Sequence, residues 1–175
     1  QSLLVASLLS LSGCGIGGSS DKQNSQGESE EEYRVGVFKD SAVQGLKYST
    51  ASFSGTTNEK GEYRYKEGEV VQFKLGETNL GVASGDRVVT PFSLATEETG
   101  ANNRARVLMS VDKDKDASNG IQVVEAKAEG LPDDISFDDE QAFESQKADI
   151  ESSMGGGLVK RDDAAQHLTG AQRWE

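Results

Sequence analysis

The stretch Gly55–Gly76, GTTNEKGEYRYKEGEVVQFKLG, decides the fold of this chain. Apolar and polar residues alternate within it at 63–65 and again at 71–75, which is the period of half-buried β-strands. Turn signals at 58–61 and 67–68 bound these two runs. Because the connections are too short for crossover helices, the stretch predicts antiparallel hairpins.

The same alternation occurs upstream, where Tyr33, Val35 and Val37 are separated by polar or small residues. Closely spaced turn signals join this run to the central stretch, so we expect an antiparallel β-sandwich. In the loop at 58–61, Gly61 is the expected position of positive φ, because short hairpin loops commonly need one such residue.

Three segments carry a resemblance to a known family: FKDSAVQGLKY at 38–48, GTTNEKGEYRY at 55–65 and GEVVQFKLG at 68–76. Together they resemble the carboxypeptidase-regulatory-like, or prealbumin-type, β-sandwich over residues 33–94. Such modules recur near the N-termini of Gram-negative surface lipoproteins and adhesins, so the resemblance implies a non-catalytic module. The sequence contains no HExxH zinc motif, so the peptidase activity of larger relatives is not implied.

Helical periodicity begins after this strand-rich part. A helix is expected at 101–111, where Val107, Leu108 and Val111 share one face. Apolar residues then alternate again at 121–123, which predicts one further strand.

The C-terminal part of the chain is expected to contain two short helices, at 139–150 and 162–168. Asp162 is the expected N-cap of the second helix, and Gly170 its expected end. The predicted fold class is therefore mainly β within an α+β arrangement, with an antiparallel β-sandwich followed by short C-terminal helices.

An acidic loop, DKDKDASNGI, follows the first expected helix at 112–121. Carboxylates at its first, third and fifth places suit a Ca²⁺ loop, since this cation takes oxygens from alternate residues of a tight turn. The pattern is incomplete, because Ala117 stands where an EF-hand loop has Gly, and Val123 where it has Glu. A polar turn and a weak Ca²⁺ site are both open interpretations. The candidate ligands are Asp112, Asp114, Asp116 and Ser118, with Glu125, two places late, as an outlying candidate.

The segment at 1–13, QSLLVASLLSLSG, carries no charge and is too short to cross a hydrocarbon core of about 30 Å as a helix. It predicts the apolar region of a signal peptide, truncated because no basic region precedes it. Leu11, Ser12, Gly13 and Cys14 resemble the lipobox of bacterial lipoproteins. The resemblance implies lipidation of Cys14, and Gly15 after it implies sorting to the outer membrane, on either its periplasmic face or the cell surface. An ordinary secretory signal with an incidental cysteine is the alternative.

Charge and composition divide the remaining chain. Residues 14–32 follow the signal region and are rich in Gly, Ser, Gln and Glu, so we expect a disordered acidic tether that begins at the lipidated cysteine. Residues 33–128 are electrically balanced and are expected to form the β-sandwich-like domain with one helix. Residues 129–175 are expected to be an acidic, partly helical segment, truncated at its end because the sole tryptophan, Trp174, stands there.

The formal net charge of −12 argues against a nucleic-acid partner, because such a chain repels phosphates. A single cysteine excludes an internal disulfide. The single histidine, His167, has no partner that the sequence places beside it, so we expect no enzymatic activity.

The expected function is that of a lipid-anchored envelope lipoprotein at the outer membrane, acting as a non-catalytic interaction module. The membrane is contacted through the lipid anchor, and the further partner is a protein or a glycan. Two alternatives stay open: the N-terminal anchor and stalk of a larger secreted enzyme of the peptidase type, or a Ca²⁺-dependent adhesin module. No cofactor is firmly expected, and Ca²⁺ is the one candidate.

Overall fold

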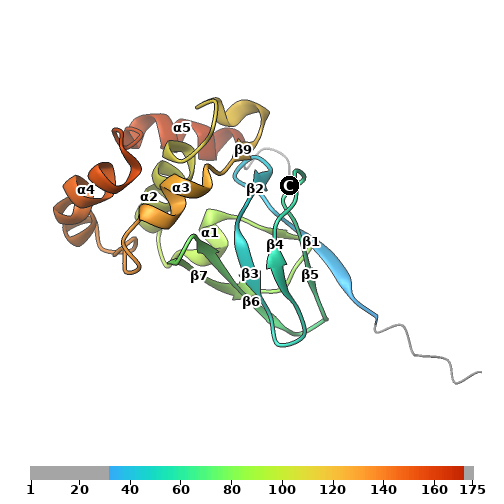
Figure 1. Ribbon diagram of the computed structural model, residues 1–175. Coiled ribbons are helices and arrows are strands. Elements are labelled where there is room, and N and C mark those ends of the chain that lie inside the picture. The colour runs from blue at the N-terminus through green and yellow to red at the C-terminus, as the bar shows by residue number, and fades with distance from the viewer. Residues whose placement is uncertain (1–31, 172–175) are drawn as a thin grey trace, which may run out of the picture. The chain divides into compact units, whose positions relative to one another are not determined.

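The computed structural model describes residues 32–171 of the chain, and Figure 1 shows strands gathered on one side and helices on the other. A three-stranded sheet has β1 (Arg34–Phe38) at its centre, between β5 (Glu62–Tyr65) and β8 (Val88–Val89). β1 and β5 are antiparallel, as expected. β1 and β8 are parallel, so the all-antiparallel arrangement predicted from the short connections is wrong at this pair.

The second sheet has four strands in the order β4-β3-β6-β7, and every neighbouring pair in it is antiparallel. The long chain excursion through this sheet separates β1 from β8, which explains why these two strands can pair in parallel. The four strands are β3 (Lys47–Ser49), β4 (Ser54–Thr56), β6 (Val70–Leu75) and β7 (Thr78–Ser84).

Aromatic side chains join the two sheets. The ring of Phe73 on β6 meets Phe38 at 4.8 Å and Tyr63 at 5.2 Å between centroids, both edge to face. All three side chains are at most 1% exposed. Their alternation along the strands, which is the pattern seen in the sequence, places them on the inner faces where they build the core.

A third, two-stranded sheet pairs β2 (Val43–Gln44) with β9 (Ile121–Gln122), again in parallel. This pair connects the strand-rich part to the segment that follows the long helix. Helix accounts for about 37% and strand for about 27% of the structure, and the sheets are not closed. The fold is therefore mixed α+β, and the expectation of a mainly β chain is corrected.

The helices occur close to the predicted positions. The helix expected at 101–111 is α2 (Glu98–Ser110), and the one expected at 139–150 is α4 (Glu140–Met154), with Asp139 as its N-cap. The last helix is α5 (Arg161–Ala171). It begins before Asp162, so Asp162 is not its N-cap, and it continues through Gly170, so Gly170 does not terminate it; both expectations are wrong. The shorter elements are α1 (Pro91–Leu94), the 3-10 turn η1 (Ala117–Asn119) and α3 (Glu125–Gly130), which spans the expected domain boundary at 128.

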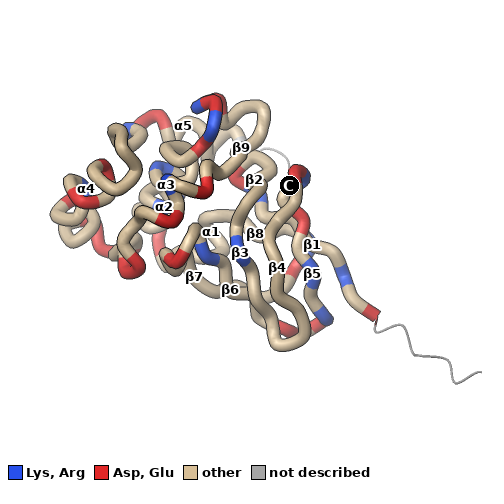
Figure 2. The backbone as a smooth tube through the Cα atoms, viewed as in Figure 1, with Lys and Arg blue, Asp and Glu red and all other residues tan. Residues whose placement is uncertain are grey.

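α2 is the centre of the helical side. Val107, Leu108 and Val111 at its end are fully buried, as their shared face predicts. Ala101 and Ala105, on another part of its surface, pack against Ala164 and Leu168 of α5, and small side chains there let the two helices approach. Acidic positions recur along α4 in Figure 2, and the rest of the surplus negative charge predicted for the C-terminal part lies in the loop that precedes this helix and at Glu129 in α3.

The loop between β4 and β5 joins strands of different sheets, so the hairpin expected there is wrong, as is the one expected between β5 and β6. The positive φ predicted for its glycine is confirmed. Gly61 has φ +73°, and a Cβ there would lie 2.6 Å from the carbonyl oxygen of Phe38. Asn58 Oδ1 accepts from the backbone N–H groups of Lys60 and Glu62, each at 3.0 Å. The loop is therefore fixed both by its own side chain and by contact with the end of β1.

Candidate functional site

The acidic loop begins where α2 ends. Asp112 forms an antiparallel bridge with Val123, so the loop leaves and returns through one pair of facing residues. The residue is 1% exposed, and its Oδ1 accepts from the N–H groups of Lys113 and Gln122, both at 2.8 Å. Asp112 thus holds together the base of the loop.

The second oxygen of Asp112 is buried and receives no hydrogen bond. The carboxyl groups of Asp112 and Asp114 interact with each other. Burial raises the pKa of Asp112, and the neighbouring Asp114 contributes in the same direction. Asp114 has a lowered pKa, chiefly because Asn119 donates its side-chain N–H to Oδ2 at 3.0 Å. Two carboxyl groups in contact need a proton or a cation between them.

Asp116 and Ser118, the other two predicted ligands, hydrogen-bond to each other. Asp116 Oδ1 accepts from the backbone N–H of Ser118 at 3.1 Å and from its hydroxyl at 2.5 Å, which caps η1. The structure therefore brings Asp112 and Asp114 together and turns Asp116 toward Ser118. Glu125 begins α3 and lines a separate cavity, beside Lys47.

A solvent-open cavity of about 240 Å³ adjoins the Asp112–Asp114 pair. Its lining includes Glu59, an exposed residue of the β4–β5 loop that sequence reasoning did not select. Lys113 and Asn119 also line it, whereas Asp116 and Ser118 do not. Across residues 32–171, no three His, Cys, Asp or Glu side chains are already gathered into a metal-holding group.

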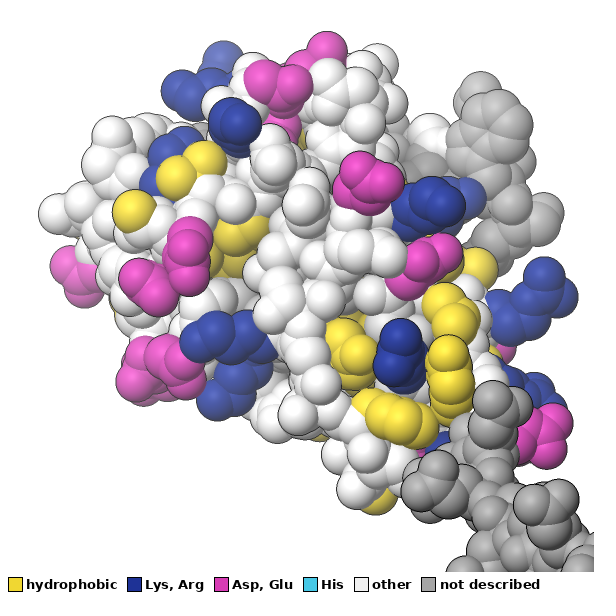
Figure 3. Space-filling view, turned by 45° about the vertical axis from the view of Figure 1, so that its right-hand side comes forward, with side chains coloured by type: hydrophobic (Ala, Val, Ile, Leu, Met, Phe, Trp, Pro, Cys, Tyr) yellow, Lys and Arg dark blue, Asp and Glu magenta, His cyan; other side chains and the backbone are white. Residues whose placement is uncertain are grey.

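A second cavity, of about 290 Å³, opens between the facing edges of β4 and β5. Tyr33, Tyr48 and Tyr63 line it, together with the polar side chains of Glu62 and Arg64. Figure 3 shows hydrophobic side chains gathered around a basic one on one face of the molecule. Tyr33, which precedes β1, is 45% exposed. The spacing of the tyrosines in the sequence gave no signal of this grouping, because their segments meet only through the fold.

The tyrosines of this cavity differ in burial, from 1% exposed for Tyr63 to 45% for Tyr33. The hydroxyl of Tyr63 donates to the carbonyl oxygen of Asp86 at 2.6 Å, and burial raises the pKa of Tyr63 to about 12. Tyr48 meets it edge to face at 5.9 Å between centroids. The guanidinium carbon of Arg64 lies 4.9 Å from the centroid of Tyr33, within cation–π range. The cavity therefore has a buried aromatic floor and an exposed, partly charged rim.

A largely buried histidine–aspartate pair joins α5 to the segment that follows β1. His167 Nε2 is 3.2 Å from Oδ1 of Asp40, which is fully buried. Hydrogen bonding to Asp40 raises the pKa of His167, against the opposing effect of burial. Among residues 32–171, no hydroxyl group hydrogen-bonds to His167.

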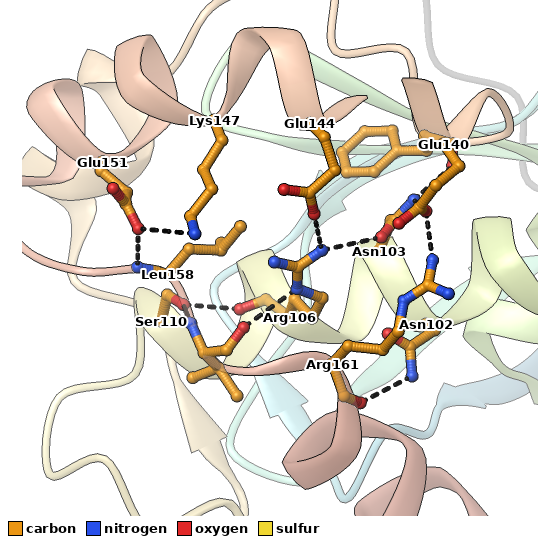
Figure 4. A network of polar contacts seen from close by, with 12 residues as sticks. Asn102, Asn103, Arg106, Ser110, Glu140, Glu144, Lys147, Glu151, Leu158 and Arg161 are labelled. Atoms are coloured by element: carbon orange, nitrogen blue, oxygen red, sulfur yellow. Dashed lines mark hydrogen bonds and ion pairs between the residues drawn. The ribbon is translucent and has the colours of Figure 1, made fainter. Parts of the chain in front are cut away.

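Polar groups on α2 tie the helices together (Figure 4). Arg106, whose side chain is 5% exposed, donates to Glu144 of α4 at 2.8 Å and to the carbonyl oxygen of Val159 at 3.0 Å. The hydroxyl of Ser110 donates to the carbonyl oxygen of Arg106 and accepts from the N–H of Val159. These polar groups hydrogen-bond to one another across neighbouring elements, so we assign them a structural role.

No family model, curated protein or solved structure matches this chain. Residues 32–171 include no helix that is both long and apolar enough to span a membrane. The predicted lipidation residue, Cys14, and the lipobox residues Leu11, Ser12 and Gly13 lie outside the described residues.

Proposed function

We propose that the protein is a lipid-anchored lipoprotein of the outer membrane and that its folded part is a non-catalytic binding module. The lipobox resemblance at Cys14 supports the anchor. The tyrosine-lined cavity between β4 and β5 is the observation that carries the binding role, because it combines exposed aromatic surface with a few convergent polar groups.

The chemistry of this cavity favours a saccharide. The flat faces of Tyr33 and Tyr48 suit the apolar face of a sugar ring, and the buried Tyr63 holds the floor in place. Glu62 and Arg64 at the rim offer an acceptor and donors for ring hydroxyl groups. Aromatic side chains need little ordering on binding, which favours recognition by a preformed surface.

We also propose that the two larger sheets constitute a prealbumin-type sandwich, in keeping with the sequence resemblance over residues 33–94. The ring contacts of Phe73 with Phe38 and Tyr63 support this, since they join side chains of opposite sheets. Such a module presents its strand edges and loops to a partner.

The saccharide proposal is tested by saturation-transfer NMR on the full chain with a panel of neutral and acidic oligosaccharides. We expect a saccharide signal that Tyr48→Ala removes, because this change deletes one wall of the cavity. The matched control is Val82→Ala, at a residue 51% exposed on β7 and absent from the cavity lining. Absence of a signal from every saccharide, or a signal equally reduced by both variants, would overturn the assignment.

A further inference from the structure

We propose that the cavity beside Asp112 and Asp114 is a low-affinity Ca²⁺ site completed by Glu59 from the distant loop between β4 and β5. The alternating carboxylates of the sequence suggested a site held within one loop. The folded chain instead assembles oxygens from two segments, so the ligand set is different from the sequence pattern.

The first support is the unpaired oxygen of Asp112. This residue is 1% exposed, and its Oδ2 is buried beside the Asp114 carboxyl without any donor. A buried acceptor without a partner is costly, and two adjacent carboxylates repel each other. A cation at this point would satisfy the free oxygen and neutralise the pair.

The second support is the composition of the adjoining cavity. Glu59 and Asn119 line it, so a third carboxylate and a side-chain amide can reach the same space. Glu59 is exposed and can therefore rotate toward the pair without breaking a packed contact. Lys113 lines the cavity too, and its positive charge reduces the expected affinity.

Ca²⁺ fits these groups better than Mg²⁺. Ca²⁺ accepts six to eight oxygens in irregular geometry and tolerates several water ligands, whereas Mg²⁺ requires a nearly ideal octahedron. Two of the carboxylates already interact, the third must rotate, and the open cavity supplies water. Together these groups make an irregular set of ligands. The expected dissociation constant is about 0.1–1 mM, as for extracellular modules.

Occupancy would couple two separate parts of the fold. Asp112 follows α2, whereas Glu59 belongs to the loop that Gly61 and Asn58 shape. A cation that contacts both Asp112 and Glu59 binds only the folded chain, so it should stabilise the native state by mass action.

The test is thermal unfolding of the full chain, treated with chelator and then titrated with Ca²⁺, with Mg²⁺ and NaCl of equal ionic strength as parallel series. We expect the melting temperature to rise with Ca²⁺ concentration, with an apparent midpoint near 0.1–1 mM, roughly the range for extracellular sites. At ten times the dissociation constant, the folding equilibrium constant should increase about elevenfold. Isothermal titration calorimetry gives the affinity directly.

The variants separate this site from the sequence pattern. Asp114→Asn should weaken Ca²⁺ binding about tenfold or more, and Glu59→Gln should weaken it several-fold. Asp116→Asn is the matched control and should leave the affinity unchanged, because its carboxylate is turned toward Ser118. Asp114 is preferred over Asp112 for the substitution, since Asp112 also holds the base of the loop.

Three results would overturn the proposal. The first is no saturable effect of Ca²⁺ on either melting or heat. The second is an equal effect of Mg²⁺, which would indicate charge screening. The third is loss of binding in Asp116→Asn with none in Glu59→Gln, which would place the cation within the single loop.

Discussion

Replacement of Arg104 by methionine should be among the most destabilising single changes on the helical side. Its side chain, 6% exposed, donates through Nη1 and Nη2 to both oxygens of Asp138, at 2.9 and 2.8 Å. It also donates to the carbonyl oxygens of Leu80, at 2.6 Å, and Gly100, at 3.0 Å. One side chain thus links α2 to β7 and to the loop before α4.

The magnitude follows from these contacts. Removing one member of a buried ion pair costs about 3–5 kcal/mol. Asp138 is 36% exposed and can be rehydrated, so we expect Arg104→Met to cost about 3 kcal/mol, at the low end of that range. The guanidinium carbon also lies 5.0 Å from the centroid of the Phe137 ring, and methionine replaces this cation–π contact with an apolar one of similar volume, so a cavity adds little.

The assay is urea unfolding followed by far-UV circular dichroism, with Arg87→Met, an exposed arginine, as the control. The control should change the free energy of unfolding by no more than about 0.5 kcal/mol. The Arg104 contact lowers the pKa of Asp138 from its ordinary 3.8. Stability from this pair is therefore present above that pKa and is lost as the pH falls through the lower, folded value, a loss absent from Arg104→Met. A cost under about 1 kcal/mol at neutral pH would refute the reasoning, because it would mean that the buried guanidinium contributes no more than a surface group.

Three further predictions concern other parts of the chain. The pKa of His167 is raised from 6.5, so its pairing with Asp40 should stabilise the protein fully below pH 6.5 and be lost as the pH rises through the folded value; melting curves across that range should show this slope in the wild type and not in His167→Gln. Gly61→Val should destabilise the protein by at least about 2 kcal/mol in urea titrations, because φ is +73° and the new Cβ would meet Phe38 O at 2.6 Å; an unchanged midpoint would contradict the assigned conformation of the β4–β5 loop. Cys14→Ser should move the protein from the membrane pellet to the soluble fraction of the expressing bacterium, and its retention in the pellet would contradict lipidation at that residue.

Much of the local structure was predictable because its causes are local. The alternation at 71–75 specified β6, and the shared face of Val107, Leu108 and Val111 specified the end of α2. The positive φ predicted for Gly61 is likewise confirmed. Strand period and turn type depend on residues only a few positions apart, so the sequence carries them directly.

The errors arise where a distant segment decides the outcome. Gly170 was expected to end the last helix, yet α5 continues through it, since Ala164 and Leu168 are held against α2. Helical packing of this kind overrides the modest unfavourable propensity of a single glycine. The parallel pairing of β1 with β8 was missed for the same reason, because nothing near β1 in the sequence indicates which distant strand lies beside it.

The sequence by itself determined the alternation of the longer strands, the positive φ at Gly61, the approximate helix positions, the negative charge and the motif at Cys14. Only the tertiary structure decided which strands pair, that Asp116 turns toward Ser118, that Glu59 lines the same cavity as Asp112 and Asp114, and that three tyrosines line another. The physical reason is that backbone period and turn conformation are set by neighbouring residues. A binding site, in contrast, is set by the packing of elements that are far apart in the chain.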